Sequence, residues 1–352
     1  MILLDDENKV KEIDKSGMLG VVESTPQMMQ EAFRLMEYSP LKNYKDIKNI
    51  FIAGMGGSAM AGDLLLNLLR DQLQVPLFVN RNYTMPEFLG ANSLVFIASY
   101  SGETEETLSC LKEAGKKEAK IICLSSGGKI KEIADEKKYP LIEIKKGLQP
   151  RAALPYFLVA MALILEKANF VRDIYPQVKE SIDVLEQLKT IYRAQCPERK
   201  NPAKQMAQKL TGKIPVVFAS TGTTEAIGKR LKNQLNENAK MNVLLTVFPE
   251  MNHNEMVGLA ELKRGEHNFS AVFIRDEEDH IRVNKRIEIT KSLLGAKIGG
   301  ILEIPSSGES RLARMLSQIY FSDFLSVYVA IISGVDPTPV DIIQKFKKEM
   351  LR

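Results

Sequence analysis

Short apolar runs alternate with longer amphipathic segments along most of this chain. The apolar runs are rich in β-branched and aromatic residues, which is typical of strands buried on both faces. The sequence between neighbouring runs is helix-prone and carries no hairpin signals. Strand, helix and strand in succession predict parallel sheets with helices on both faces, which is an α/β fold of three layers.

The expected elements can be placed along the chain. In the first half the pattern predicts a strand from Ile50 that leads into a helix by Leu65, strands at 76–80, 94–98, 120–124 and 141–144, and helices at 104–116 and 130–137. In the second half it predicts a strand from Ile214, strands at 243–248, 271–274 and 297–304, helices at 224–235, 280–294 and 310–332, and a last helix from Pro339. This restart suggests two copies of one α/β unit.

The length of 352 residues also favours two domains, because it exceeds the usual size of a single core. We expect residues 1–165 to form an N-terminal arm with the first domain, 166–200 a helical connector, and 201–352 the second domain. The arm, residues 1–48, should pack on the first domain. The first loop of the second copy has a single glycine, Gly222, so we expect no second phosphate site there.

Composition narrows the class of protein. A net charge of +4, from 48 basic and 44 acidic residues, does not favour a nucleic-acid partner. Cys110, Cys123 and Cys196 lack CxxC spacing, which favours a reduced cytoplasm and disfavours a metal site. The acidic N-terminus is no signal peptide, and the apolar run 156–165 is about half of what a bilayer requires. A soluble cytoplasmic protein is expected.

Small hydroxyl residues follow the strand expected at 94–98. Ser99, Ser101 and Thr104 offer hydroxyl groups, and Gly102 lets a ligand approach the backbone. A helix that begins near Thr104 directs its N–H groups and positive dipole end at the same place, which favours a phosphate. The alternative is that Thr104 only caps the helix, although capping explains one hydroxyl and not three.

The strand from Ile50 ends in a similar turn. Gly54, Gly56, Gly57 and Ser58 separate it from the next helix, which suits a phosphate or a dinucleotide. The spacing misses GxGxxG, so the dinucleotide is disfavoured. Ligands of parallel sheets bind at the carboxyl ends of strands, so we expect both turns to line one pocket.

Arg151 stands at the entry to a long apolar helix. A guanidinium at the start of a buried helix must meet an anion, which is either a carboxylate of the protein or a ligand. The sequence does not decide between them.

A dense polar cluster in the second half could move protons. Glu237 lies between two asparagines just past an expected helix, and His253 follows the strand that ends at Phe248. A carboxylate and an imidazole on neighbouring loops suit proton abstraction next to a carbonyl. Glu250 and Glu255 are rival bases, and any one of these acids could simply be a solvated loop residue.

Other chemistries fit less well. His253 with the two glutamates lacks HExxH spacing, so a metal centre is disfavoured. The segment GGSAM is not the GxSxG elbow of a serine nucleophile. The other two histidines, His267 and His280, stand in sequences typical of an exposed turn and of a helix start.

Five segments together resemble a known family. GMGGSAMAGDL, SYSGETEET, GLQPRAALPY, LNENAK with PEMNHNE, and GVDPTPVDIIQKFKK occur in this order along nearly the whole chain. They resemble the bifunctional phosphoglucose/phosphomannose isomerases, which are built from two sugar-isomerase (SIS) domains. The resemblance implies two SIS-type αβα domains with parallel sheets and an aldose–ketose isomerase that acts on glucose 6-phosphate, mannose 6-phosphate and fructose 6-phosphate.

The resemblance also implies roles for single residues. It assigns the sugar phosphate to Gly57, Ser58, Ser99, Ser101 and Thr104. It makes Arg151 the group that stabilises the enediolate, Glu237 the base that shuttles a proton between C1 and C2, and His253 a group for ring opening that comes from the partner subunit of a homodimer. Thr338 stands where the dual-specificity family has a threonine that makes room for the C2 epimer. No metal or redox cofactor is needed.

A lysine of the last helix should join the ring-opening step. The resemblance leaves Lys345 and Lys347 open. We expect Ile342, Ile343, Phe346 and Met350 to form a buried stripe, and Lys347 lies closer to that stripe, so Lys347 is preferred.

Two alternatives stay open at this point. A SIS module that only senses a sugar phosphate would bind through the same hydroxyl groups without turnover. An isomerase of another phosphosugar, such as a heptose or an amino sugar, would share the anchor and the base.

Overall fold

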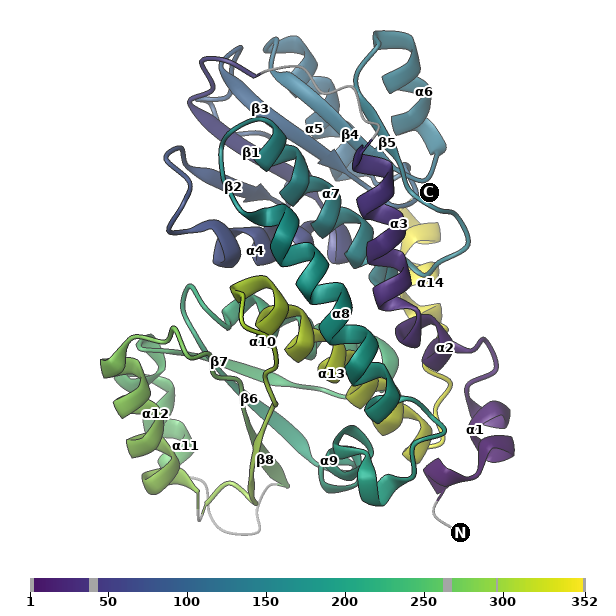
Figure 1. Cartoon of the computed structure of the whole chain (residues 1–352), viewed down its shortest axis with the longest axis vertical. Helices are drawn as coiled ribbons and strands as arrows, with labels where there is room; N and C mark the ends of the chain where they lie inside the picture. The colour runs from purple at the N-terminus through teal and green to yellow at the C-terminus, as the bar shows by residue number, and fades with distance from the viewer. Residues whose placement is uncertain (1–2, 38–43, 262–267, 296, 351–352) are drawn as a thin grey trace. The chain divides into compact units, whose positions relative to one another are not determined.

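The computed structural model describes residues 3–37, 44–261, 268–295 and 297–350. The chain divides into two compact units, each with one parallel sheet (Figure 1). We call Ser24–Asp183 with Gly308–Ala313 the first-sheet unit. The second-sheet unit comprises Met1–Glu23, Val184–Ser307 and Arg314–Arg352.

The first-sheet unit has five parallel strands. They are β1 (Asn49–Gly54), β2 (Leu77–Asn80), β3 (Ser93–Ala98), β4 (Lys120–Ser125) and β5 (Leu141–Glu143), in the order β2-β1-β3-β4-β5. One face is covered by α3 (Thr25–Glu37), α4 (Gly56–Leu69) and α7 (Leu154–Lys167), and the other by α5 (Glu105–Lys116) and α6 (Gly128–Lys137). All six residues of β3 are buried, as expected for a strand covered on both sides.

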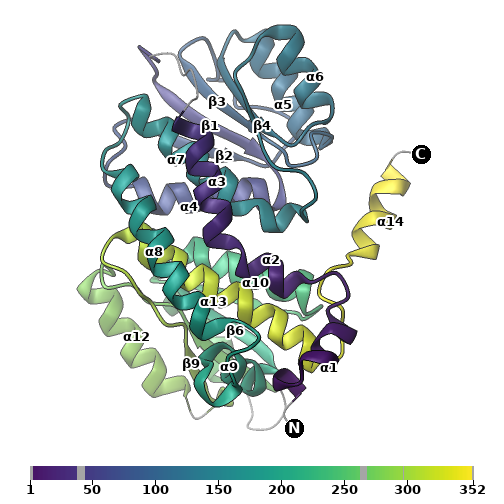
Figure 2. The ribbon, with the colours of Figure 1, turned by 45° about the vertical axis from the view of Figure 1, so that its right-hand side comes forward.

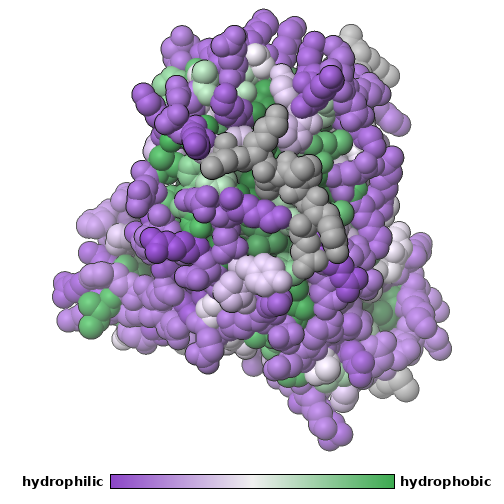
Figure 3. Space-filling model, turned by 45° about the horizontal axis from the view of Figure 1, so that its top comes forward, coloured by the Kyte–Doolittle hydropathy of each residue, from purple (hydrophilic) through white to green (hydrophobic). Residues whose placement is uncertain are grey.

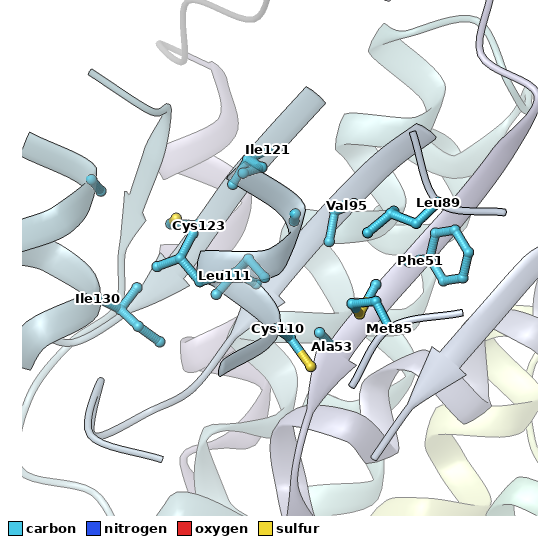
Figure 4. Packing of buried hydrophobic residues seen from close by; sticks show 13 residues of the cluster. Phe51, Ala53, Met85, Leu89, Val95, Cys110, Leu111, Ile121, Cys123 and Ile130 are labelled. Carbon is cyan, nitrogen blue, oxygen red and sulfur yellow. The ribbon is translucent and has the colours of Figure 1, made fainter. Parts of the chain in front are cut away.

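Figure 4 shows the core between the first sheet and the helices α5 and α6. Side chains of Phe51, Val95 and Ile121 from three strands meet Leu111 and Ile130 from the two helices. Two cysteines complete this core. Burial raises the pKa of the Cys110 thiol to about 11 and that of Cys123 to about 12, so both thiols stay protonated and pack as small apolar groups.

The second-sheet unit has four parallel strands among its described residues. They are β6 (Ile214–Ser220), β7 (Leu244–Phe248), β8 (Phe269–Phe273) and β9 (Ile301–Glu303), in the order β7-β6-β8-β9. Its helices include α9 (Pro202–Leu210), α10 (Glu225–Asn238), α11 (Glu255–Ala260), α12 (Ile281–Leu294), α13 (Arg311–Ile332) and α14 (Asp341–Met350). Side chains of α11 and α12 pack with the sheet in one cluster that includes Leu259, Ile287 and Leu294.

The two sheets share one strand order. The sequence β2-β1-β3-β4 of the first sheet corresponds to β7-β6-β8-β9 of the second, with the first strand of each copy in an inner position. The two three-layer α/β units predicted from the hydrophobic pattern are thus confirmed. The end strand β9 is shorter than expected, since it spans only three residues of the predicted range 297–304.

Helix α13 is long and apolar enough to cross a membrane by length and composition alone. However, 94% of its most apolar window is buried within the fold. Tyr320, Phe324 and Tyr328 of this helix are almost fully buried, and their rings lie next to one another. This helix is therefore explained as a core helix.

The compact units differ from the predicted domain ranges in the N-terminal arm. Its first part, with η1 (Leu3–Asp5), α1 (Glu7–Ile13) and α2 (Met18–Glu23), belongs to the second-sheet unit, and only its later residues join the first. The buried ammonium of Lys204 explains this, because it donates to the carbonyl of Leu4 (2.7 Å) and to Asp5 (2.9 Å). The expected connector 166–200 is likewise divided, because α8 (Ile174–Tyr192) runs from one unit into the other and is followed by η3 (Glu198–Lys200).

The surface in the view of Figure 3 is mostly hydrophilic, with hydrophobic residues visible between the hydrophilic ones. This agrees with a content of 26% charged residues, since charged side chains are mostly exposed in folded proteins.

Candidate functional site

The first glycine turn packs directly against the turn that carries Arg151. Gly56 adopts a left-handed φ of +52°, and α4 begins there. A Cβ atom on Gly57 would lie 2.8 Å from the Pro150 carbonyl oxygen and 3.1 Å from the Arg151 Cα atom. Only glycine therefore allows this approach of α4 to η2 (Pro150–Ala153).

Arg151 is 3% exposed and lies in η2, immediately before α7. A buried guanidinium needs compensating acceptors, and it strengthens the local field in which an anion would sit. The chain thus places one cation beside the N-terminal end of α4, where the helix dipole already favours negative charge.

The second turn follows β3 and is organised by the Ser99 hydroxyl. Ser99 Oγ lies 2.8 Å from Thr104 Oγ1 and accepts a hydrogen bond from the Gly102 N–H (3.2 Å). Ser101 Oγ accepts from the Glu103 N–H (3.2 Å). Ser99 is 2% exposed, whereas Ser101 is exposed to solvent.

Thr104 is the residue before α5. Among the described residues, its side chain makes no hydrogen bond to the first turn of that helix. Its hydroxyl faces Ser99 instead. The interpretation that Thr104 only caps the helix is therefore wrong. The first N–H groups of a helix have no intrahelical partner, so the start of α5 keeps its capacity to bind an anion.

A third turn, which was not predicted from the sequence, supports the second. Gly102 has φ +72°, and a Cβ atom there would lie 1.8 Å from the Gly127 carbonyl oxygen. Ser126 Oγ donates to the Tyr100 carbonyl (2.7 Å), which fixes the turn after β4 against the turn after β3. The segment Ser125-Ser126-Gly127-Gly128 again has the pattern of a strand, a serine and glycine turn and a helix, so a signal was present.

These turns belong to one edge of the first sheet. The strands β1 and β3 pair directly, and a Cβ atom on Gly54 at the end of β1 would lie 2.7 Å from the Ala98 carbonyl oxygen at the end of β3. The structure thus brings Gly57, Ser58, Ser99, Thr104 and Arg151 to neighbouring turns at the carboxyl edge. Two helix starts, hydroxyl groups and a guanidinium make an anion site suited to a phosphate.

Glu237 belongs to the second-sheet unit, where it lies in the last turn of α10. The prediction that it falls just past a helix is wrong. The helix continues through Asn238 because that side chain is buried and donates to Ser326 Oγ of α13 (2.8 Å). A bidentate pair between Arg230 and Asp323 (3.0 and 2.8 Å) joins the same two helices, so the helix that carries Glu237 is held rigidly.

His253 ends the short helix η4 (Glu250–His253), which follows β7. The imidazole is exposed, but the backbone is anchored by the buried Met251 and by Asn252, whose amide donates to Thr290 Oγ1 (3.2 Å). The prediction that His253 follows the strand ending at Phe248 is confirmed, although the residue ends a short 3-10 helix. His280 begins α12, where its Nδ1 accepts from the Arg282 N–H (3.1 Å), and His267 lies outside the described residues.

The two rival acids lie around the same loop. Glu250 accepts a hydrogen bond from the Asn254 amide (3.0 Å), and Asn254 in turn accepts from the Glu255 N–H (2.6 Å). Burial and the neighbouring Glu250 raise the pKa of Glu255 above its ordinary value. Both acids are exposed and help to shape the loop around His253, which favours a structural role for them.

The last helix differs most from expectation. Ile342, Ile343, Phe346 and Met350 are 76%, 41%, 63% and 52% exposed, so the predicted buried stripe is wrong for the single chain. Figure 2 shows α14 extending away from the other helices of its own unit. Both Lys345 and Lys347 lie on this exposed helix, and the packing argument that preferred Lys347 no longer applies.

Thr338 lies on the segment between α13 and α14, and its N–H donates to the Asp336 carboxylate (3.0 Å). Two carbonyl oxygens of this segment accept hydrogen bonds from Lys240, which follows the end of α10 and lies three residues after Glu237 in the chain. The structure therefore brings the predicted base and the predicted specificity residue into one part of the second-sheet unit.

The edge of the second sheet that corresponds to the phosphate turn is acidic. In place of small hydroxyl residues, β8 is followed by Asp276, Glu277, Glu278 and Asp279. The buried guanidinium of Arg314 contacts the first three of these carboxylates at 2.5–2.9 Å. Carboxylates repel a phosphate, so this edge does not suit a second phosphate site.

Two family profiles and one solved structure define the class of protein to which this chain belongs. The SIS domain profile matches residues 43–164, and the profile of the bacterial phospho-glucose isomerase C-terminal SIS domain matches residues 199–350. The C-terminal domain of glucosamine-fructose-6-phosphate aminotransferase from Francisella tularensis has a similar fold, with a TM-score of 0.68 and 18% identity over 91% of this chain and 97% of that chain. The protein is thus a tandem SIS-domain protein.

Full-length relatives define the family. The chain is 40% identical to the bifunctional phosphoglucose/phosphomannose isomerase of Caldicellulosiruptor bescii, over 95% of this chain and 98% of the relative. It is 33% identical to the D-glucosamine-6-phosphate 4-epimerase of Sulfolobus acidocaldarius, over 72% of this chain and 75% of that relative. The chain belongs to the family of bifunctional phosphoglucose/phosphomannose isomerases, as its motifs predicted.

Proposed function

We propose that the protein interconverts glucose 6-phosphate and mannose 6-phosphate with fructose 6-phosphate through a cis-enediol intermediate. The observation that carries the proposal is family membership along almost the whole chain. The anion site of the first-sheet unit adds support, because this reaction needs an anchor for the phosphate dianion while protons move elsewhere on the sugar.

The phosphate end is assigned to the first-sheet unit. Ser99 and Thr104 would bind phosphate oxygens with their hydroxyl groups, and the starts of α4 and α5 would add backbone N–H groups near Gly57, Ser58 and Ser101. Arg151 would stabilise the negative charge of the enediolate, for which a buried, permanently charged guanidinium is suited.

The reacting end is assigned to residues of the second-sheet unit. Glu237 would take the proton from C2 of the open-chain aldose and return it to C1, while a proton moves from O2 to O1. His253 and a lysine of α14, either Lys345 or Lys347, would transfer protons between the ring oxygen and O1 during ring opening. Thr338 would leave room for both epimers at C2.

The active enzyme is proposed to be a cytoplasmic homodimer in which His253 comes from the partner subunit. The exposed position of His253 and the uncovered apolar side of α14 support an association with a second copy, because a short helix is only marginally stable without packing.

The base is tested by isotope exchange. Glu237→Gln should lower the exchange of the C2 hydrogen of glucose 6-phosphate with D2O by about 10²- to 10⁴-fold, because the amide cannot accept the proton. The dissociation constant for the sugar phosphate should change little, since the anchor is intact. Glu255→Gln serves as the matched control and should keep exchange near the unsubstituted rate. Undiminished exchange in Glu237→Gln would reject Glu237 as the base.

A second candidate activity is epimerisation of an amino-sugar phosphate, since one relative is an epimerase of glucosamine 6-phosphate. Incubation with glucosamine 6-phosphate and analysis by NMR tests the second activity, because inversion at C4 changes the proton couplings of H4 from those of glucosamine 6-phosphate. Turnover of glucose 6-phosphate without an epimer product supports the isomerase.

A further inference from the structure

Lys240 makes a set of contacts that none of the assigned roles explains. Helix α10 ends at Asn238, and Lys240 follows two residues later with a left-handed φ of +53°. Its ammonium group donates to the carbonyl oxygens of Glu237 (2.8 Å) and Asn238 (3.3 Å). The last carbonyls of a helix lack intrahelical donors and attract cations, so Lys240 closes the end of α10 with its own side chain.

The same ammonium reaches a second segment. It donates to the carbonyl oxygens of Asp336 (3.0 Å) and Pro337 (3.2 Å), which lie almost a hundred residues later in the chain. The next residue is Thr338, whose N–H is bound by the Asp336 carboxylate. One cation therefore ties the turn that carries Glu237 to the segment that carries Thr338.

The left-handed backbone of Lys240 is a conformation that favours glycine over lysine. A left-handed residue just past a helix is usually glycine, because a Cβ atom is disfavoured in that conformation. Glycine would fit this backbone better than lysine does, but it has no ammonium group. The hydrogen bonds of the ammonium group are thus contacts that glycine could not make.

We propose that Lys240 is a positioning residue, which holds Glu237 and Thr338 in the arrangement required for proton transfer at C1 and C2. The proposal rests on the proposed isomerase function. Lys240 acts through the backbone of its neighbours and needs no contact with the substrate. Misplacement of the base should slow the chemical step and leave the phosphate anchor unchanged.

The test compares two lysines of the same conformation. Lys240→Gly removes the ammonium and relaxes the backbone. Lys138→Gly does the same at the end of α6, where Lys138 has φ +56° and is exposed. For Lys240→Gly we expect kcat to fall on the order of 10²-fold at nearly constant KM, with an unchanged or higher melting temperature. Lys138→Gly should keep both kinetic constants.

The ratio of turnover with mannose 6-phosphate to turnover with glucose 6-phosphate gives a second readout. This ratio should shift in Lys240→Gly because Thr338 moves with its segment, and Lys240→Arg should restore much of both values by returning a cation. Equal kinetics and an equal ratio in the two glycine variants would overturn the proposal, and so would a loss of kcat that merely follows a lower melting temperature. Absence of isomerase activity in the unsubstituted protein would instead reject the proposed function.

Discussion

At the scale of single residues, the proposed anion site depends on hydroxyl groups that face one another. Ser99 and Thr104 are in contact at 2.8 Å, and neither side chain caps α5 among the described residues. Each hydroxyl can therefore turn toward an incoming phosphate at the cost of one weak hydrogen bond between neutral groups.

This pairing leads to a prediction for Thr104. Replacement by valine keeps the shape but removes the hydroxyl, so KM for the sugar phosphate should rise on the order of 10-fold, the usual effect of losing a hydrogen bond to a charged group. Steady-state kinetics and inhibition by inorganic phosphate measure the change. Thr104→Ser keeps the hydroxyl and should stay close to the unsubstituted KM. A similar loss in both variants would show that the methyl group, and not the hydroxyl, is what matters.

At the scale of elements, the contact between α4 and η2 determines where Arg151 lies. Three features fix this contact: the glycine turn after β1, the buried Ser58 on the first turn of α4, and the proline that begins η2. The hydrophobic pattern predicted both elements, but it gave no information about their approach, because that distance depends on the absence of one Cβ atom.

Gly57→Ala tests this contact. The added methyl group would lie 2.8 Å from the Pro150 carbonyl oxygen, so α4 and η2 must separate and Arg151 must move. We expect kcat/KM to fall on the order of 10²-fold, as small misplacements of charged groups in active sites do. Gly90→Ala, where a Cβ atom would meet nothing within 4 Å, is the control. Kinetics for Gly57→Ala that match those of the control would contradict the packing argument.

At the scale of the whole molecule, the sequence predicted the sheets well and the outer elements poorly. Continuous apolar runs such as Leu94–Ala98 indicate strands buried on both faces, which predicted the two parallel sheets but not the order of their strands. The burial of α14 could not be predicted, because its apolar stripe satisfies helical periodicity whether or not a partner covers it. The attachment of the N-terminal arm depends on Lys204, a buried cation whose partners lie about two hundred residues away.

The residues of the candidate site likewise divide into those with a local sequence signal and those whose positions depend on distant partners. Hydroxyl turns after strands have a local signal, so Ser99, Thr104 and Gly57 could be found and brought together from the sequence. The position of Glu237 within a helix depends on Asn238 and Ser326, which are distant in sequence. Lys240 has no local signal at all, because its carbonyl partners come from two separate segments.

The proposed sharing of His253 between subunits belongs to this scale. In a hybrid dimer of one Glu237→Gln and one His253→Ala subunit, one site would carry both substitutions and the other neither. Such hybrids should have about half the activity of the unsubstituted dimer, although each parent dimer has little. Separately tagged subunits, purified as hybrids and assayed for fructose 6-phosphate, give the measurement. If each chain completes its own site, both sites stay damaged and the hybrids remain as weak as the parents.

The acidic turn after β8 has a consequence for how a substrate arrives. The corresponding edges of the two sheets differ in character: hydroxyl groups and Arg151 in one unit, and in the other three carboxylates that contact Arg314. Long-range electrostatics therefore favours the arrival of a phosphate at the first of these edges and disfavours it at the second. The two copies share one strand order, yet their corresponding edges have diverged in charge, so the duplication has left only one of them suited to an anion.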